Sequence, residues 1–417
     1  MDDDELTQWK AIVRGEVQPS WDLLTMALSR SNWLTESGKE TSIWALEQIA
    51  SFLGDAWLKR SFRDGSPLMS LLWATSNDAP LAHLGRIELG ARLALLRDAP
   101  GWRRLRKLAR GRTGAWTPVL LQLEVGGLAL RDGRGVEFEP PLATGKFGDL
   151  LIRGSTTMLV ETTSVGLPKE MREASRFSDR ALLRLQMIGA EYGISVAGTV
   201  AEVVTEATLE AWLHEVTKAA GEIAGTGRRQ RLASPGGSHL ELIDGPMADG
   251  ETISLRGPTV KGDEWLRLAL RIRDKAEQGE TDHPLWIRID EGSSLWGLTE
   301  QASWPRPVMH AALATNVLDV IGSFRHVAGV VVAGPLIFGV PGGSVGSWEL
   351  VGGNALSFIA PARLNLHREA VMVMGAHEAA SNQLEEWHKW YAGEGTWLDW
   401  ALEHLGQSKS TDLIGPA

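Results

Sequence analysis

The chain has 417 residues, of which 43% are hydrophobic, a formal net charge of −10 and no cysteine. This length predicts two or three domains with a sizeable core, and the lack of cysteine excludes disulfides, thiolate zinc sites and cysteine nucleophiles. No uninterrupted apolar run reaches the roughly 18 residues that a membrane helix needs, and the acidic start MDDDELTQWK is unlike a secretory signal, so we expect a cytoplasmic protein with no membrane partner.

Residues 1–112 are predicted to form a helical N-terminal domain, which is a candidate surface for a protein partner. Tryptophans recur there at intervals of 11 to 16 residues, at Trp9, Trp21, Trp33, Trp44, Trp57 and Trp73. Nothing else recurs with them, so we interpret them as one core aromatic residue per helix of an irregular bundle and not as a sequence repeat.

The end of this segment, GWRRLRKLARGR, carries six basic residues in ten positions and no acidic one. Two interpretations remain open: a solvated helix face, or a set of phosphate contacts to which Arg103 and Arg104 would belong.

Two short apolar strands around a polar turn are predicted in GKFGDLLIRGSTTMLVETTSV, residues 145–165. Asp149 and Glu161 lie six positions either side of Ser155, so an antiparallel hairpin turning there sets the two carboxylates opposite each other. Two carboxylates this close in an apolar layer need a shared proton or a cation, and a divalent metal is the simplest answer. Thr163 points to the same face as Glu161.

Upstream, a helix ending near Gly126-Gly127 and a strand at residues 136–138 complete the order helix, strand, strand with Asp, strand with Glu-x-Thr. This order resembles the core of the PD-(D/E)XK nuclease superfamily. The resemblance implies a restriction-endonuclease-like α/β/α fold with a central mixed sheet over residues 113–335, preceded by the helical domain.

In that family the two acids bind magnesium and a glutamate on the preceding helix assists. The resemblance therefore implies that Asp149, Glu161 and the backbone carbonyl of Thr162 hold Mg²⁺ or Mn²⁺, with Glu124 assisting. This sequence departs from the family pattern at two positions, because Thr163 stands in place of the lysine and Gly148 in place of the proline. Lys169, just past the following turn, is the expected substitute for the lysine.

A helix is predicted over residues 169–190, with arginines at every fourth position, namely Arg172, Arg176, Arg180 and Arg184. A phosphate-tracking ridge and a salt-bridged, solvated face are both open interpretations. A buried strand (192–204), an amphipathic helix (205–224) and a mobile loop (225–238) follow, and Arg228 and Arg229 in that loop are further candidate phosphate contacts.

Alternation of strands and helices then continues the α/β pattern. Residues 238–245 and 251–257 are predicted to pair as a hairpin. Further on we expect a helix at 263–278, a strand at 285–289, a helix at 308–324 and a strand at 327–333. Residues 336–417 are expected to form a C-terminal extension of short strands and a tryptophan-rich helix.

Three classes of function are compatible with these features. The first is a Mg²⁺-dependent nuclease that hydrolyses phosphodiester bonds in DNA, with RNA not excluded and restriction or defence as one setting. The second is a nuclease-fold protein that binds nucleic acid or a protein partner without cutting. The third is an unrelated hydrolase or interaction protein. The missing lysine separates the first class from the second, because a threonine hydroxyl brings no positive charge to the attacking water.

Overall fold

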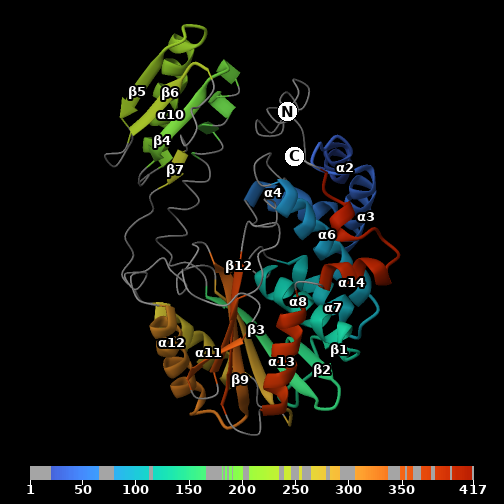
Figure 1. Cartoon of the computed structure of the whole chain (residues 1–417). Helices are drawn as coiled ribbons and strands as arrows, with labels where there is room; N and C mark the ends of the chain where they lie inside the picture. Colours follow the sequence, from blue (N-terminus) through green and yellow to red (C-terminus); the bar gives the residue numbers. More distant parts are fainter. Residues whose placement is uncertain are drawn as a thin grey trace. The chain divides into compact units, whose positions relative to one another are not determined.

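The computed structural model describes residues 20–64, 79–111, 116–165, most of 181–200, 206–233, 239–245, 253–255, 264–278, 282–291, 306–336, 348–352, 355–359, 368–376, 381–394 and 397–415. The chain forms two compact units (Figure 1). The smaller comprises residues 1–18 and 167–261, and the larger comprises residues 19–166 and 262–417. These boundaries differ from the predicted ranges 1–112, 113–335 and 336–417.

An eight-stranded mixed sheet forms the centre of the larger unit, in the order β1-β2-β3-β8-β9-β12-β11-β10. Its strands are β1 (Gly135–Phe138), β2 (Leu150–Arg153), β3 (Met158–Val165), β8 (Leu285–Glu291), β9 (Val327–Leu336), β10 (Trp348–Gly352), β11 (Ala355–Ile359) and β12 (Arg368–Gly375). Strands β1, β2 and β3 form an antiparallel meander, whereas β8 runs parallel to both β3 and β9. The remaining strands pair antiparallel. The predicted mixed α/β sheet is thus confirmed.

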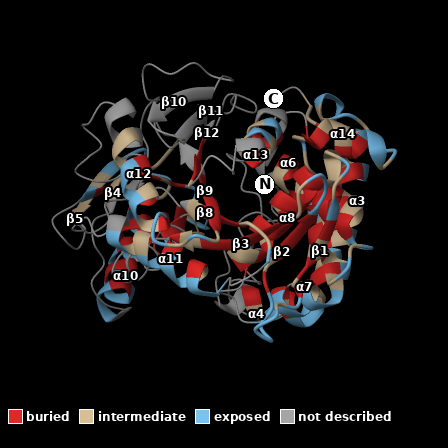
Figure 2. Ribbon diagram, turned by 90° about the horizontal axis from the view of Figure 1, so that it is seen from below, coloured by how far each residue is buried: buried red, intermediate tan, exposed pale blue. Residues whose placement is uncertain are grey.

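Helices cover both faces of this sheet (Figures 1 and 2). On one face lie α11 (Glu264–Gln278) and α12 (Arg306–Ile321). Their buried residues share an apolar cluster with Leu159 of β3, Ile287 of β8 and Val330 of β9. The opposite face carries α8 (Trp116–Arg131) and α13 (Ser381–Glu394). Figure 2 shows that buried residues are concentrated in the strands and in the helix surfaces turned toward them.

The N-terminal helices of the larger unit share the core of the sheet's second face. These helices are α2 (Trp21–Ser29), α3 (Glu36–Leu53), α4 (Asp55–Asp64), α6 (Ala79–Leu96) and α7 (Trp102–Ala109). Their buried residues, including Trp57, form one apolar cluster with Val160 of β3 and Trp387 of α13. These helices therefore do not form a separate N-terminal domain, because their buried apolar residues belong to the same core as the sheet.

The C-terminal segment returns to the same helices. Helix α14 (Trp397–His404) packs on α6 and α8, and the indole of Trp397 donates a hydrogen bond to the carbonyl oxygen of Gly127 at 3.0 Å. The hydroxyl of Thr35 donates to the carbonyl oxygen of Asp412, in the 3₁₀ turn Ser410–Asp412, at 2.6 Å. The tryptophan-rich helical end was predicted correctly, and it is part of the larger unit's core.

The smaller unit contains a second, four-stranded sheet in the order β5-β6-β4-β7. Its elements are β4 (Ser195–Val200), α10 (Glu206–Ile223), β5 (Arg229–Ala233), β6 (His239–Ile243) and β7 (Ile253–Leu255). Helix α10 buries Leu209, Trp212, Leu213 and Val216, as predicted.

Two expectations for this unit are wrong. Residues 225–238 contain strand β5, which pairs antiparallel with β6, because Gln230 and Leu232 alternate with exposed arginines and give the segment a half-buried face. The segments 238–245 and 251–257 do not form a hairpin: β6 pairs with β5 and β4, whereas β7 pairs parallel with β4.

Most of the predicted helix 169–190 lies outside the described residues, and the helix predicted to end near Gly126-Gly127 continues through both glycines as α8 to Arg131. Helices α10, α11 and α12 and strands β8 and β9 lie where the hydrophobic periodicity placed them. Among the helices that the structure describes, none combines the length and apolar character that crossing a membrane requires.

Candidate active site

The β2–β3 hairpin brings two carboxylates together. Its register pairs Leu150 with Val160 and Ile152 with Met158. One step beyond the Leu150–Val160 pair, Asp149 is opposite Glu161, and the backbone amide of Asp149 donates to Glu161 Oε1 at 3.3 Å. The opposed acid pair that the sequence predicted is present.

A lysine bridges the pair. Lys275, in the last turn of α11, places its Nζ atom 3.0 Å from Asp149 Oδ2 and 2.8 Å from Glu161 Oε2. The Glu161 side chain is only 3% exposed, and the Lys275 side chain is 17% exposed. The positive charge that two such carboxylates require is supplied from the helix that covers this face. The predicted substitute, Lys169, lies outside the described residues.

Burial and neighbouring charges shift the pKa values of Glu161 and Lys275. Burial and the negative charge of Asp149 raise the pKa of Glu161 to about 7, although Lys275 acts in the opposite direction. Burial alone would lower the pKa of Lys275, but the two carboxylates outweigh this effect and raise it. The Lys275 ammonium therefore stays charged at neutral pH. Because the pKa of Glu161 is about 7, its carboxyl group is partly protonated at neutral pH and can release the proton when another cation binds.

Thr162 fixes the orientation of Asp149. Its backbone amide donates to Asp149 Oδ2 at 2.6 Å, and its hydroxyl is 3.0 Å from the same oxygen. The hydroxyl also lies 3.3 Å from the carbonyl oxygen of Pro118 in α8. Thr162 thus holds the carboxylate from β3, and metal ligation by its carbonyl oxygen stays a prediction. Thr163 is buried on the same strand face as Glu161, one alternation further along.

A third carboxylate, which the sequence analysis did not single out, lies beside the pair. Glu139 directly follows β1, and its amide donates to the carbonyl oxygen of Asp149 at 3.0 Å. Its side chain accepts a hydrogen bond from the buried amide of Gln122 at 3.0 Å. Burial is the main cause that raises its pKa, and the charge of Asp149 adds to it. Its φ of 47° is in the left-handed region, a conformation that a non-glycine residue keeps only when its surroundings impose it.

Glu124 is not brought to the Asp149–Glu161 pair. Its carboxylate binds the guanidinium of Arg288 at 2.9 Å and accepts from the hydroxyl of Tyr391 at 2.9 Å. Arg288 is in register with Thr162, so both point to the α8 face of the sheet, whereas Glu161 points to the α11 face. Burial alone would lower the pKa of Arg288, but Glu124 raises it, so the buried guanidinium stays charged. The resemblance placed Glu124 at the metal; the structure pairs it with Arg288 and Tyr391, and its part in metal binding stays a prediction.

Gly148 makes the close approach of the two strands possible. A Cβ atom at this position would be 2.7 Å from Leu159 Cδ1 and 3.3 Å from Glu161 Oε1. Glycine here leaves room for the Glu161 carboxylate, and this gives a physical reason for the departure from the family's proline.

The predicted phosphate-binding arginines divide into three groups. Arg103 and Arg104 are exposed on α7, whereas Arg106 and Arg110 of the same basic run bind the carbonyl oxygens of Ser51 and Phe52 near the end of α3. Arg184, Arg228 and Arg229 are exposed in the smaller unit, where Arg184 is 3.7 Å from Glu210 and Arg229 is 3.6 Å from Glu241. Arg172, Arg176 and Arg180 lie outside the described residues.

Lys275 is a candidate site residue that the sequence analysis missed. The apolar stripe of α11 includes Leu268, Ile272 and Ala276, which are all buried. Lys275 is seven positions after Leu268 and three after Ile272, so it falls on this buried stripe. A charged residue on the core face of an amphipathic helix is the sequence signal that could have identified it.

The donor set fits a hard divalent cation, because Asp149 and Glu161 both offer carboxylate oxygens. Within the described ranges, no group of three or more histidine, aspartate and glutamate side chains is arranged to hold a metal ion. A cation at this site would therefore be held by two carboxylates, with backbone oxygens or water as its other ligands.

In comparisons with known proteins, no protein-family model, no curated protein and no solved structure matches the chain.

Proposed function

We propose that this protein is a metal-dependent nuclease that hydrolyses phosphodiester bonds in DNA, built on a restriction-endonuclease-like core. The observation that carries the proposal is the convergence of Asp149, Glu161 and Lys275 at one point of the sheet. Two carboxylates and an ammonium are the groups that such a reaction needs; the sequence analysis identified the two carboxylates but expected the lysine at position 169.

The order of elements supports the same proposal. Helix α8 precedes the antiparallel meander β1-β2-β3, and α11 then leads into β8, which is parallel to β3. The smaller unit is inserted between β3 and α11. With this insertion set aside, the chain has the helix and three strands on which the family resemblance rests, followed by a helix and a strand parallel to β3.

Each residue then has a defined task. Asp149 and Glu161 would hold Mg²⁺ or Mn²⁺, which when bound offsets phosphate charge and lowers the pKa of an attacking water. Thr162 keeps Asp149 in place through two hydrogen bonds. The Lys275 ammonium has three N–H donors, of which two point to the carboxylates, so the third can orient the water or bind a phosphate oxygen.

One observation favours the second class of function, a nuclease-fold protein that binds without cutting. Lys275 Nζ contacts both carboxylates at 3.0 Å or less and so already neutralises much of their charge. In a binding protein this ion cluster would be a structural element of the sheet and would need no metal.

Metal-dependent cleavage separates the two functions. The nuclease proposal predicts that the full-length protein cuts DNA with Mn²⁺ or Mg²⁺ and not with EDTA, and that Glu161→Gln and Lys275→Gln both abolish cutting. Glu277→Gln, at an exposed position of α11 two residues from Lys275, is the matched control and should leave cleavage unchanged. Cleavage that survives Glu161→Gln would refute the assignment of the site. RNA is tested in parallel, and the cytoplasmic location expected from the sequence is part of the same proposal.

A further inference from the structure

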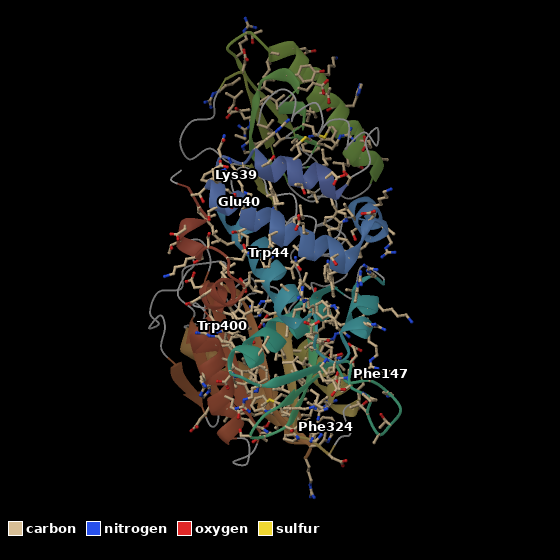
Figure 3. All side chains as sticks on the ribbon, turned by 90° about the vertical axis from the view of Figure 1, so that its right-hand side faces the viewer. Lys39, Glu40, Trp44, Phe147, Phe324 and Trp400 are labelled. Atoms are coloured by element: carbon tan, nitrogen blue, oxygen red, sulfur yellow. The ribbon has the colours of Figure 1, made fainter. Side chains whose placement is uncertain are left out.

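An exposed aromatic side chain lies close in sequence to Asp149 of the carboxylate pair. Phe147 is 52% exposed, and the only other large apolar residues that are exposed in the described part of the chain are Leu108, Leu266 and Leu270. Phe147 precedes Asp149 by two residues, in the segment that joins β1 to β2. Figure 3 shows it at the surface of the larger unit, on the loop that leads into the hairpin.

The surroundings of this ring are basic. The guanidinium of Arg104 lies over one face of the ring, with Cζ 4.9 Å from the centroid. Arg103 and Lys107 on α7 are exposed, as is Lys146 next to Phe147. Neither residues 101–112 nor residues 140–148 contain an acidic residue. The acids that flank the second segment are Asp149 of the carboxylate pair and Glu139, whose pKa the charge of Arg104 acts to lower. An exposed ring with a guanidinium over one face, in two segments that carry basic residues and no acid, matches the chemistry of a nucleotide, which has a flat base and an anionic phosphate.

The position of the ring limits which form of nucleic acid can use it. Two residues of extended chain span at most about 7 Å, so a base stacked on Phe147 belongs to a nucleotide close to the phosphate that Asp149 would engage. In a duplex the faces of the bases are covered by their neighbours, whereas unpaired bases offer a free face to aromatic side chains.

We propose that Phe147, together with Arg104, forms a stacking site for an unpaired base, and that single-stranded nucleic acid is the substrate class of this site. Arg104 holds one face of the ring and binds the adjacent phosphate, and the base stacks on the solvent-exposed part. The link to cleavage rests on the proposed nuclease function, but the stacking itself does not depend on it.

Binding measured without metal tests the proposal. The full-length protein is titrated, in EDTA, into a fluorescent single-stranded oligonucleotide containing 2-aminopurine and into the matching duplex. Phe147→Ala should weaken single-strand binding roughly tenfold or more and remove the 2-aminopurine quenching, because stacking on one aromatic ring contributes this much per base. Phe147→Trp should retain both properties. Leu266→Ala, which removes another exposed apolar side chain (61% exposed), is the matched control and should change neither.

The salt dependence of binding distinguishes the role of Phe147 from that of Arg104. Phe147→Ala should leave the slope of log K against log salt unchanged, whereas Arg104→Gln should flatten it by about 0.7, the value for one phosphate contact on a single strand. Equal affinity of Phe147→Ala and wild type for the single strand, or wild-type affinity for the duplex equal to that for the single strand, would overturn the proposal.

Failure of this proposal and failure of the nuclease function give different results. A protein that cuts DNA but is indifferent to Phe147→Ala would retain the nuclease function and lose the stacking site. A protein that shows ring-dependent binding to single strands and never cuts would retain the stacking site and lose the nuclease function.

Discussion

Replacing Lys275 by methionine, in the absence of metal, should destabilise the larger unit in a pH-dependent manner. The change leaves Asp149 and Glu161 close together without their counter-ion. At an effective dielectric constant of about 20, an ion pair at 2.8 Å has a gross attraction of about 6 kcal/mol. Part of this is offset because the ammonium no longer has to be desolvated, so we expect a net loss of about 3 to 5 kcal/mol at pH 8, as for other broken buried pairs.

The sign of the pH dependence follows from Glu161. Its pKa in the folded protein is about 7, above the ordinary value of 4.5, so the folded state binds a proton that the unfolded chain has released. The free energy of unfolding of the wild type should therefore fall as the pH rises from 4.5 through 7, by a total of about 3 kcal/mol. Without Lys275 this pKa rises further, so the destabilisation by Lys275→Met is smaller at pH 5.5, where Glu161 is protonated and only the pair with Asp149 is lost, than at pH 8.

Urea unfolding followed by tryptophan fluorescence, in EDTA at pH 5.5 and 8, measures this difference. All of the 18 tryptophans except Trp9 and Trp212 belong to the larger unit, so the signal reports on the unit that contains the site. Lys389→Met is the matched control, because its side chain is 71% exposed in its ion pair with Asp132 and should contribute less than about 1 kcal/mol. A loss for Lys275→Met that is equal at both pH values, or no larger than that of the control, would refute the reasoning.

Two further substitutions test separate parts of the account. Gly148→Ala should lower the cleavage rate at least tenfold and the free energy of unfolding by about 1 to 3 kcal/mol, because the added methyl group would overlap Leu159 and press on the Glu161 carboxylate. Unchanged cleavage kinetics and unfolding curves would contradict this. Glu124→Gln should lower the free energy of unfolding by about 3 to 5 kcal/mol, because Arg288 would stay buried without its counter-charge. The folded variant should still bind Mn²⁺ with wild-type affinity in calorimetry, and weakened Mn²⁺ binding would show that Glu124 belongs to the metal site.

The core of the candidate site could be predicted because it depends on local register. Asp149 and Glu161 lie on one hairpin, and their pairing follows from equal spacing around Ser155 and from apolar residues that leave only one register in which both faces are buried. The same periodicity located α10, α11, β8 and β9.

The partners of these carboxylates could not be predicted in the same way, because they come from distant parts of the chain. Lys275 is 114 positions from Glu161, and the smaller unit lies between them in sequence. The partners of Glu124 were missed for a related reason. Which face of the sheet α8 covers is decided by the packing of α8 and α13, and this packing pairs Glu124 with Arg288 instead of with the acid pair.

The division of the chain into structural units also could not be predicted from local sequence patterns. A helical segment with its own tryptophans is typical of a separate domain, but its buried residues form a single cluster with β3 and α13. Strand β5 was read as a loop because its glycine and arginine content outweighed the alternation of Gln230 and Leu232. Pairing with β6, which extends the sheet, is what makes this segment a strand.

The most direct test of the central claim is cleavage of circular single-stranded DNA and of supercoiled plasmid by the purified full-length protein, with Mn²⁺ or with EDTA, alongside Glu161→Gln and Lys275→Gln. We predict products with Mn²⁺ for the wild type alone, with circular dichroism showing that both variants are folded. No cleavage of either DNA or of RNA at high Mn²⁺, or cleavage that persists in both variants, would contradict the claim that Asp149, Glu161 and Lys275 form a nuclease site.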